Sequence, residues 1–594
     1  MANHWLIEEI EKALKALSLE LTEEEIKLEH PANIALGDFS TNVAMVLAKK
    51  AGRKPKDLAE QIKANILAVG NPQIKEVKVA GSGFINFYLT PDFFSDSLKQ
   101  ILQQGDDFGH IEILAGQKVL IEYTDPNPFK EFHIGHLMSN TVGEAMARLI
   151  AGNGAEVKRA CYQGDVGVHV AKTLWGMFKL ENEMPSEEAT LAEKLKFLGR
   201  AYALGSTEYE EGSENAKEGI TIINKKVYKK SDPKLNELYA LGRKWSLDYF
   251  ETIYRQLGTK FDYYFFESET AEVGQKIVED GLAKNVFAKS DGAIVFRGEN
   301  FDSHLHTRVF LNAEGLPTYE AKELGLAKIK ANKYPADISI SVTGNEINDY
   351  FKVVLRAMQE LLPELAVKIR HLSHGMLRLP SGKMSSRTGQ VITAESLIGD
   401  VKIKVLAKIQ NRELSEEEKN DIAEKVAIGA IKYSILKQGI GKDIIFDFDK
   451  SISFEGDSGP YLQYAYTRAL SVLKKAEGNI VPETKSQNPR DLVSGSTSVL
   501  EKLLYQFPEV TERAYQELAP QYIVSYLIEV AGAFNSFYAQ NQIIGSDDEA
   551  HRLALTRATS IVLKNGLNLL GIPVLEKMWF FAFWRKITPK LVEG

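Results

Sequence analysis

The fold of this chain is decided by residues 117–138, which read QKVLIEYTDPNPFKEFHIGHLM. The first seven residues form a short, mainly apolar run typical of a buried strand, and a loop with two prolines follows it. From Gly135 onward, apolar residues recur at helical spacing as far as Leu149. A strand, a loop and a helix in this order predict the opening unit of a parallel α/β domain.

The start of this predicted helix carries a pair of histidines, in the string Phe132-His133-Ile134-Gly135-His136-Leu137. Their imidazoles can donate hydrogen bonds to phosphate oxygens, and Gly135 lets a nucleotide approach the backbone. The helix N-terminus adds unpaired N–H groups and the positive end of its dipole. The pattern therefore favours binding of an ATP whose α-phosphate is attacked. Two alternatives stay open: the pair holds a metal ion, which for zinc would require further ligands, or the histidines are ordinary surface or core residues.

A second loop has the composition of a phosphate-binding segment. Residues 379–389 read LPSGKMSSRTG, with flanking glycines, two cations and several hydroxyl groups. A loop of this kind can close over a pyrophosphate leaving group and neutralise developing negative charge. The alternative is a surface loop of small polar residues, which is common in proteins.

The rest of the chain divides into regions of different periodicity. Residues 1–110 combine helical spacing with a strand-like stretch that contains a glycine turn, which predicts a small α+β domain. Helical spacing also dominates residues 190–256 and the stretch from 395 to about 578, while short strands are expected near 292–296 and 337–343. The expected divisions are 1–112, 113–395 with an insertion at about 178–300, 396–578, and a tail, 579–594, to which no function is assigned.

The composition is that of a folded protein with several domains. The 594 residues are 44% hydrophobic and 26% charged, with a formal net charge of −8. These values exclude a disordered chain, and the acidic excess excludes a general binder of polyanions, so nucleic acid must meet local basic faces. No apolar stretch is long enough to span a membrane, and the start lacks a secretory signal. The single cysteine, Cys161, excludes a disulfide framework and a cysteine-only metal site. We therefore expect a cytoplasmic protein that binds neither membranes nor DNA.

The histidine string and the Lys-Met-Ser-Ser-Arg loop resemble the two signatures of class I aminoacyl-tRNA synthetases. Further stretches resemble arginyl-tRNA synthetases more narrowly: EYTDPN (122–127), QGDVG (163–167), LPTYEAKE (316–323), GPYLQYA (459–465) and FNSFY (534–538). Residues 37–44 and 81–87 resemble the additional N-terminal domain of that family. The resemblance covers roughly residues 1–578. It implies a multidomain α/β protein with a Rossmann-type parallel-sheet catalytic domain, an N-terminal α+β domain on the elbow or D-loop side of tRNA, and a C-terminal all-α anticodon-binding bundle.

The resemblance also implies roles for residues around both loops. His133, His136 and Lys383 are expected to stabilise charge on the transferring phosphate. The second lysine of the general class I loop is replaced here by Ser386, and Lys130, three residues before the first histidine, is expected to supply that charge. Otherwise Lys130 is a solvated loop residue. The further residues expected to bind ATP are Gly135, Gly344, Glu346, Met384, Ser385, Ser386 and Arg387; for Gly344 the alternative is an ordinary strand-to-helix turn.

Arginine itself is expected to contact Glu122, Asn127, Asp165, Tyr319 and Glu323, by the same resemblance. Carboxylates suit a guanidinium and an ammonium group, and positions four apart share one face of a helix, so Tyr319 and Glu323 can converge. Glu323 stands where the family usually has an aspartate, which shifts the carboxylate by about one methylene. The alternatives are that Glu122 and Asn127 cap the turn around Pro126, and that Lys322 and Glu323 lie on an exposed helix surface.

Transfer RNA is expected to contact the helical C-terminal region. Tyr461, Gln463, Tyr464 and Arg468 offer aromatic faces for unstacked bases and polar groups for base edges. Most aromatic residues of such a bundle must nevertheless belong to its core. A basic run at Lys225–Lys230 either meets the tRNA backbone or forms a solvated helix face.

The expected reaction is the activation of L-arginine by ATP with Mg2+, followed by transfer to the terminal ribose of tRNA(Arg), with release of AMP and diphosphate. No tightly bound protein metal site and no covalent enzyme nucleophile are expected, and the expected state is a monomer. The resemblance further implies that activation requires bound tRNA. Two alternatives stay open: another adenylate-forming or nucleotide-transferring enzyme of the same superfamily, and a non-catalytic tRNA-binding or regulatory paralogue.

Overall fold

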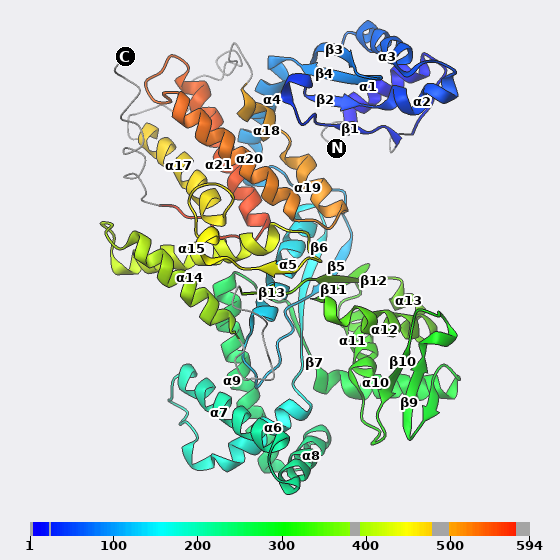
Figure 1. Ribbon diagram of the computed structural model, residues 1–594, viewed down its shortest axis with the longest axis vertical. Coiled ribbons are helices and arrows are strands. Elements are labelled where there is room, and N and C mark those ends of the chain that lie inside the picture. Colours follow the sequence, from blue (N-terminus) through cyan, green and yellow to red (C-terminus); the bar gives the residue numbers. More distant parts are fainter. Residues whose placement is uncertain (1–3, 23–24, 380–391, 478–497, 578–594) are drawn as a thin grey trace.

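The computed structural model describes residues 4–22, 25–379, 392–477 and 498–577. Its central sheet has five parallel strands in the order β12-β11-β5-β6-β7 (Figure 1). The strands are β5 (Lys118–Glu122), β6 (Glu156–Gln163), β7 (Tyr263–Phe266), β11 (Ile338–Gly344) and β12 (Ile369–His374). The strand order reverses at β5, so the carboxyl ends of β5 and β11 border one crevice. The expected Rossmann-type sheet is confirmed.

The first crossover helix, α5 (Ile134–Gly152), is buried along nearly its whole length. It lies close to the strand end because Gly143 has no side chain: a Cβ atom there would stand 2.2 Å from Cγ of Tyr123. Apolar residues of β5 and α5 share one core with helices of the C-terminal region. The 3-10 turn η6 (Asn345–Ile347), α12 (Asn348–Leu361) and α13 (Pro363–Ala366) connect β11 to β12.

Two additions extend from the sheet. The first is helical and contains α6 (Val168–Lys179), η4 (Glu181–Glu183), α7 (Leu191–Glu210), α8 (Glu214–Lys229) and α9 (Pro233–Leu257). The second is an antiparallel sheet of β8 (Ala288–Ser290), β9 (Ala293–Arg297) and β10 (Thr307–Leu311), with η5 (Gly298–Asn300), between α10 (Glu267–Ala283) and α11 (Tyr319–Lys333). The sequence predicts one insertion at about 178–300, whereas β7, within that range, pairs with β6 in the central sheet. The four-residue strand β7 is too short to stand out by periodicity.

The N-terminal region is the expected α+β domain. It contains α1 (His4–Lys15), α2 (Val43–Ala51), α3 (Pro55–Val69) and α4 (Pro91–Gln104), with η2 (Ile34–Leu36) and η3 (Gly105–Asp107). Its antiparallel sheet has the order β1-β2-β4-β3, from β1 (Leu28–Glu29), β2 (Phe39–Thr41), β3 (Ile74–Ala80) and β4 (Phe84–Leu89). α2 and α3 are separate helices, because Gly52 caps α2 in the left-handed conformation and Pro55 begins α3.

The C-terminal region is a helical bundle. Its helices are α14 (Ala394–Ile409), α15 (Glu416–Leu436), α16 (Phe448–Ser451), α17 (Gly459–Glu477), α18 (Val499–Leu504), α19 (Phe507–Gln516), α20 (Gln521–Gln540) and α21 (Glu549–Leu569). It departs from an all-α structure at β14 (Ile444–Ile445), which pairs in parallel with β13 (Leu377–Arg378). The tail at 579–594 lies wholly outside the described residues.

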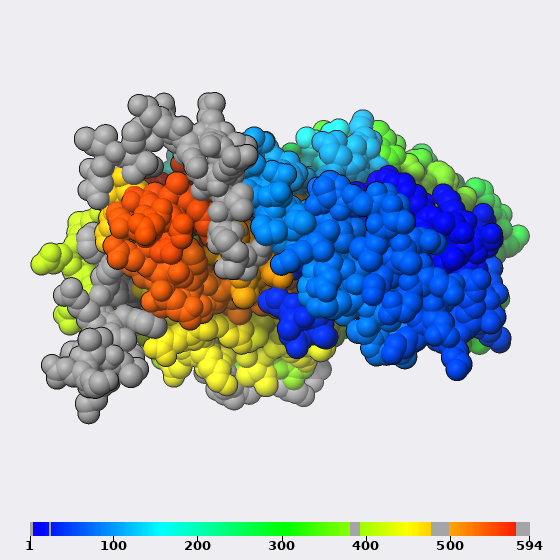
Figure 2. Space-filling model, turned by 90° about the horizontal axis from the view of Figure 1, so that it is seen from above, coloured from blue at the N-terminus to red at the C-terminus, as the bar shows by residue number. Residues whose placement is uncertain are grey.

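The N-terminal domain packs against the bundle, so distant parts of the sequence lie side by side (Figure 2). Tyr505, between α18 and α19, is buried with its ring centroid 5.3 Å from that of Phe93, 5.7 Å from that of Phe94 and 6.2 Å from that of Phe39. Lys502 and Asp38 add an ion pair of 2.7 Å. Across the described parts of the chain, no helix is both long enough and apolar enough to cross a membrane.

Candidate functional site

The loop between β5 and α5 has an unusual backbone. Thr124, Asp125 and Phe129 have φ angles of 81°, 48° and 68°, in the left-handed region that side-chain-bearing residues seldom adopt. The Thr124 amide donates to Oγ of Ser139 on α5 at 2.9 Å, and the Tyr162 amide donates to Oδ1 of Asp125 at 2.7 Å. Neighbouring elements therefore hold this loop in a strained conformation at the carboxyl edge of the sheet.

The two histidines of the string lie at the N-terminus of α5. The ring nitrogen Nδ1 of His133 accepts from the amides of Gly135 and His136, while Nδ1 of His136 accepts from the His133 amide at 3.2 Å. The rings stack with their centroids 3.6 Å apart. Gly135 makes room for this arrangement, because a Cβ atom there would stand 2.9 Å from the His133 ring.

Both imidazoles are neutral at physiological pH. Burial, with the charge of Lys130, lowers the pKa of His133 to about 4. Burial, then His133 and Lys130, lowers the pKa of His136 well below its usual value. Because each Nδ1 accepts a hydrogen bond, each proton must reside on Nε2. The N-terminus of α5 therefore carries two Nε2–H donors, and neither Nδ1 is free to bind a metal ion.

A cluster of acidic side chains lies beside the strained loop. Glu122 ends β5, is 3% exposed, and has its Oε2 atom 3.2 Å from Nζ of Lys330 on α11. Burial and the negative charge of Glu122 raise the pKa of Asp125 well above its usual value and that of Glu323 to about 8. Three carboxyl groups thus share one lysine, an arrangement that favours a cationic ligand.

A second buried pair borders this cluster. Nζ of Lys322 lies 2.6 Å from Oε2 of Glu267 at the start of α10, and both side chains are buried. Lys322 also lies over the ring of Tyr319, 5.1 Å from its centroid, while Tyr319 itself is 64% exposed. Lys322 is therefore not on an exposed helix surface, and the alternative interpretation of this segment is wrong for that residue.

The other residues expected to bind arginine have different surroundings. The side chains of Asn127 and Glu267 both approach Gly164: a Cβ atom there would stand 2.2 Å from Oδ1 of Asn127 and 3.1 Å from Oε1 of Glu267. Asn127 therefore lies beside the pair formed by Glu267 and Lys322. Asp165 is fully buried, and its carboxylate accepts hydrogen bonds from the side chains of Tyr239, Arg243 and Ser268 and from the Ser268 amide, at 2.7–3.0 Å. Its oxygens are thus occupied by the protein.

The residues expected to bind ATP lie at two places in the described chain. Gly344 ends β11, and the carboxylate of Glu346 occupies the space that a Cβ atom at Gly344 would fill. Lys130 is half-buried, and burial and the nearby charge of Lys172 lower its pKa, so it is not an ordinary solvated lysine. Lys383, Met384, Ser385, Ser386 and Arg387 lie outside the described residues.

The residues expected to bind tRNA divide into two groups. Arg468 lies over the rings of Tyr464 and Tyr538, 4.5 Å and 5.1 Å from their centroids, and donates to Asn535. Asn535 in turn donates to the hydroxyl of Tyr461 at 2.9 Å, which makes a half-buried aromatic and polar cluster on α17 and α20.

Gln463, by contrast, is fully buried. Its amide donates to the carbonyls of Lys425 and Pro573, at 3.1 Å and 2.7 Å, so it packs the bundle and cannot reach a base in this conformation. In the basic run, Lys225 and Lys226 pair with Glu314 and Asp232.

Sequence reasoning missed four residues of the acidic site: Asp125, Glu267, Lys322 and Lys330. Asp125 stands before a proline, where an aspartate is typical of a turn. The lysines and Glu267 pair across long sequence separations, for which no local signal exists. The only hint was the presence of several charged residues on a helix, α11, that the α/β pattern places against the sheet.

Three stretches of the chain match known protein families. Residues 97–448, more than half of the chain, match the tRNA synthetases class I (R) catalytic domain. Residues 462–578 match the DALR anticodon binding domain, and residues 4–89 match the arginyl tRNA synthetase N terminal domain. The three matches follow the same order as the three regions of the fold.

Curated relatives are similar along almost the whole chain. The arginine–tRNA ligase of Treponema denticola is 32% identical over 567 residues, which cover 93% of this chain and 95% of that protein. The arginine–tRNA ligase of Clostridium acetobutylicum is 32% identical over 556 residues, which cover 93% and 96%. The solved Thermus thermophilus arginyl-tRNA synthetase, 24% identical, shows the same fold, with a TM-score of 0.77 over 97% of this chain and 100% of that chain. The chain belongs to the arginyl-tRNA synthetase family.

Proposed function

We propose that this chain charges tRNA(Arg) through the acidic cluster and the histidine pair at the carboxyl edge of its sheet. The observation that supports this most directly is the set of three carboxyl groups sharing Lys330 beside two neutral Nε2–H donors. A cationic amino acid and a polyphosphate would then lie next to each other, as formation of an aminoacyl-adenylate requires.

The acidic cluster would hold the substrate arginine. Glu122, Asp125 and Glu323 outnumber the one lysine that faces them, and a bound guanidinium or ammonium group would favour the charged forms of these carboxyl groups. Asn127 and the exposed ring of Tyr319 would border the ligand. Asp165 would act indirectly, because its hydrogen bonds to Ser268 fix the start of α10 and hence Glu267.

Activation is an attack by the arginine carboxylate on the α-phosphorus of ATP, which breaks the bond to the β-phosphate oxygen and releases pyrophosphate. His133 and His136 would donate from Nε2 to the phosphate oxygens, where negative charge grows. Lys130 would add positive charge, together with Lys383 and the loop that follows it. Gly344 and Glu346 would border the adenosine.

Magnesium enters this proposal through the nucleotide. The phosphates of ATP would carry the ion, since Mg2+ is usually bound through substrate phosphates. Among the described residues no group of three or more His, Cys, Asp or Glu side chains is arranged to hold a metal ion. When bound to the phosphates, magnesium would neutralise part of their charge.

Transfer RNA would approach the bundle through Tyr461, Tyr464 and Arg468. The aromatic rings suit stacking of unpaired bases, and the guanidinium suits a base edge or a phosphate. In the second step a hydroxyl of the terminal ribose attacks the arginyl carbonyl, and AMP leaves. We expect the chain to act as a monomer.

The test is ATP–pyrophosphate exchange with each of the twenty amino acids, with and without total tRNA. The proposal expects exchange with arginine alone, appearing when tRNA is added. Exchange with another amino acid would retain the adenylate chemistry and contradict the assignment of the acidic cluster. A folded sample without exchange under any condition would favour a binding protein without activity.

A further inference from the structure

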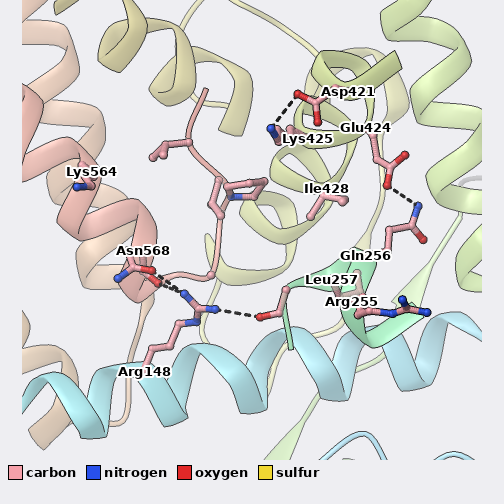
Figure 3. Close-up of a pocket in the computed structure, with 15 residues that line it drawn as sticks. Arg148, Arg255, Gln256, Leu257, Asp421, Glu424, Lys425, Ile428, Lys564 and Asn568 are labelled. Carbon is pink, nitrogen blue, oxygen red and sulfur yellow. Dashed lines mark hydrogen bonds and ion pairs between the residues drawn. The ribbon is translucent and has the colours of Figure 1, made fainter. Parts of the chain in front are cut away.

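An open cavity of about 490 Å³ lies between the catalytic region and the helical bundle. Its lining comes from α5, the end of α9, α15, and α21 with the segment that follows it (Figure 3). Arg148 of α5 extends along one side of this cavity and reaches Asn568 of α21. The cavity therefore lies beside a direct polar contact between the two parts of the molecule.

The guanidinium of Arg148 donates hydrogen bonds to three residues, each on a different side of it. Nε donates to Oε1 of Glu144 at 2.7 Å, and Nη2 donates to the carbonyl of Gly258 at 3.0 Å. Nη1 donates to the side-chain and backbone oxygens of Asn568, at 2.6 Å and 3.1 Å. A lysine could not make these contacts together, because its ammonium is a compact point charge on a flexible stem.

The hydrogen bond to Glu144 connects Arg148 to the strained loop between β5 and α5. Glu144 is 2% exposed and accepts from Nε of Arg159 at 3.0 Å, and it also accepts a hydrogen bond from the hydroxyl of Tyr123. Tyr123 is fully buried and stands directly between Glu122 and Thr124. A displacement of Arg148 would therefore shift Glu144 and, through it, Tyr123, which lies between the acidic side chain of Glu122 and the left-handed backbone at Thr124.

The hydrogen bond to Gly258 connects Arg148 to the same loop by a second route. Gly258, which accepts from Arg148, is followed by Thr259, whose hydroxyl donates to Oδ1 of Asn140 at 3.0 Å. The Asn140 amide donates to Oγ1 of Thr124, also at 3.0 Å. Thr259, Asn140 and Thr124 are all buried, so each lost bond would leave a polar group without water to replace it.

The bundle side of the contact is tied into its own helices. Lys432 of α15 is 1% exposed and donates to the carbonyls of Leu257 and Gly571, at 2.6 Å and 2.8 Å. Gln463 of α17 donates to the carbonyl of Pro573. Through Gln463, the segment after α21 is fixed to α17, the helix that also carries Tyr461, Tyr464 and Arg468. Through Lys432, it is fixed to the end of α9.

We infer that Arg148 is a positioning residue for the arginine site, and that its contact with Asn568 makes arginine affinity depend on how the helical bundle is seated. The inference rests on the proposed function, in which the acidic cluster takes arginine. The strained loop is costly to maintain, and its two buried supports converge on one guanidinium that the bundle helps to fix. By linkage, a ligand that shifts α21 changes arginine affinity, and arginine changes the affinity for that ligand by the same factor.

The experiment uses the full chain and compares variants at the exposed end of the contact. Asn568→Ala removes the side-chain acceptor, and Asn568→Asp retains an acceptor oxygen. The matched control is Asp106→Asn, which breaks the exposed ion pair between η3 and Lys564, four residues before Asn568 on α21. Arginine affinity is measured by titration calorimetry, the KM values for arginine and ATP by aminoacylation of tRNA(Arg), and the melting temperature by calorimetry.

We expect Asn568→Ala to weaken arginine binding and raise the arginine KM about 3- to 10-fold, with the ATP KM unchanged. Asn568→Asp should restore the affinity, and Asp106→Asn should leave it unaltered. Adding Arg148→Lys to Asn568→Ala should cost less than the sum of the two changes, because they remove one shared contact. A lower melting temperature in Asn568→Ala with an unchanged arginine affinity overturns the inference alone. An unaltered chain that binds no arginine overturns the proposed function and the inference together.

Discussion

The imidazole rings of His133 and His136 stack with their centroids 3.6 Å apart and their planes 18° apart, at the first turn of a buried helix. In this geometry a charge on one ring opposes a charge on the other, and both stay neutral. The pair therefore acts by donating hydrogen bonds rather than by carrying positive charge. Lys130 is the nearby side chain that supplies charge.

Removal of one of these donors should slow the chemical step. We expect His136→Asn to lower kcat of ATP–pyrophosphate exchange about 100- to 1,000-fold, because one hydrogen bond to the developing phosphate charge is lost. Arginine affinity should change little. The control is His304→Asn, at an exposed position in the turn between η5 and β10. A His136→Asn variant with kcat within about threefold of the value for the unaltered chain would contradict the role.

Acid should destabilise the fold through its buried histidines. The pKa is lowered to about 4 in His133 and His371, and to about 3 in His169, in each case mainly by burial. Below the unfolded pKa of about 6.5, the unfolded chain binds protons that the folded chain does not, so the free energy of unfolding falls as pH falls. The expected slope is about 1.4 kcal/mol per pH unit for each such histidine. Urea unfolding at pH 7.5 and pH 5 measures it, and equal stability at both values would refute the prediction.

Arginine binding should release protons through Glu323. Its pKa of about 8 means that the carboxyl is largely protonated at pH 7, while a bound guanidinium favours the charged form. Arginine affinity should therefore rise between pH 7 and pH 9, by at most about tenfold per pH unit. Calorimetry in buffers of different ionisation enthalpy measures the release. Glu323→Gln should abolish the proton release and weaken arginine binding, and Glu323→Asp is the conservative comparison. If Glu323→Gln releases as many protons as the unaltered chain, the Glu323 carboxyl is not their source.

The two groups of bundle residues should respond differently to substitution. Arg468→Ala should weaken tRNA binding about tenfold, because it removes a group from the aromatic cluster, with little effect on stability. Gln463→Ala should lower the free energy of unfolding by about 1–3 kcal/mol, since two buried carbonyls lose their donor. Filter binding and urea unfolding separate these effects. The division fails if Gln463→Ala weakens tRNA binding without loss of stability.

Docking of the N-terminal domain should weaken as pH rises. Both ring nitrogens of His30 face acceptors, the carbonyl of Asp38 at 2.7 Å and Oε2 of Glu509 at 3.0 Å. Burial opposes the charge, but the hydrogen bond and charge of Glu509 raise the pKa above its usual value. This contribution is complete below pH 6.5 and is lost as pH rises through the folded pKa. Hydrogen exchange in α19, corrected for intrinsic rates, should accelerate at high pH. His30→Gln should remove that dependence, and the exposed His110→Gln should not.

The parts of the site that could be predicted from sequence are those formed within one short stretch. The strand, loop and helix from Lys118 to Gly152 follow directly in the chain, so periodicity and the glycine placed the histidine pair at a helix start. The central sheet followed from the same pattern. The divided insertion did not, because β7 offers only four residues of signal.

The remaining parts depend on contacts between distant residues. From the sequence, Lys322 is expected to be a surface lysine. In the structure, α10 places Oε2 of Glu267 2.6 Å from Nζ of Lys322. The neighbouring positions Gln463 and Tyr464 share a motif, yet the helix turns one inward and the other toward the surface. Helical spacing gives the angle between two side chains, whereas the packing of the bundle decides which of them meets solvent.

The burial of Tyr505 among Phe39, Phe93 and Phe94 also sets an order of events during synthesis. A chain is made from its N-terminus, so the first domain emerges long before the ring that fills its aromatic cluster. Throughout that interval the cluster has an apolar gap that only a residue near the other end of the chain can close. The first domain to leave the ribosome is therefore among the last to be finished.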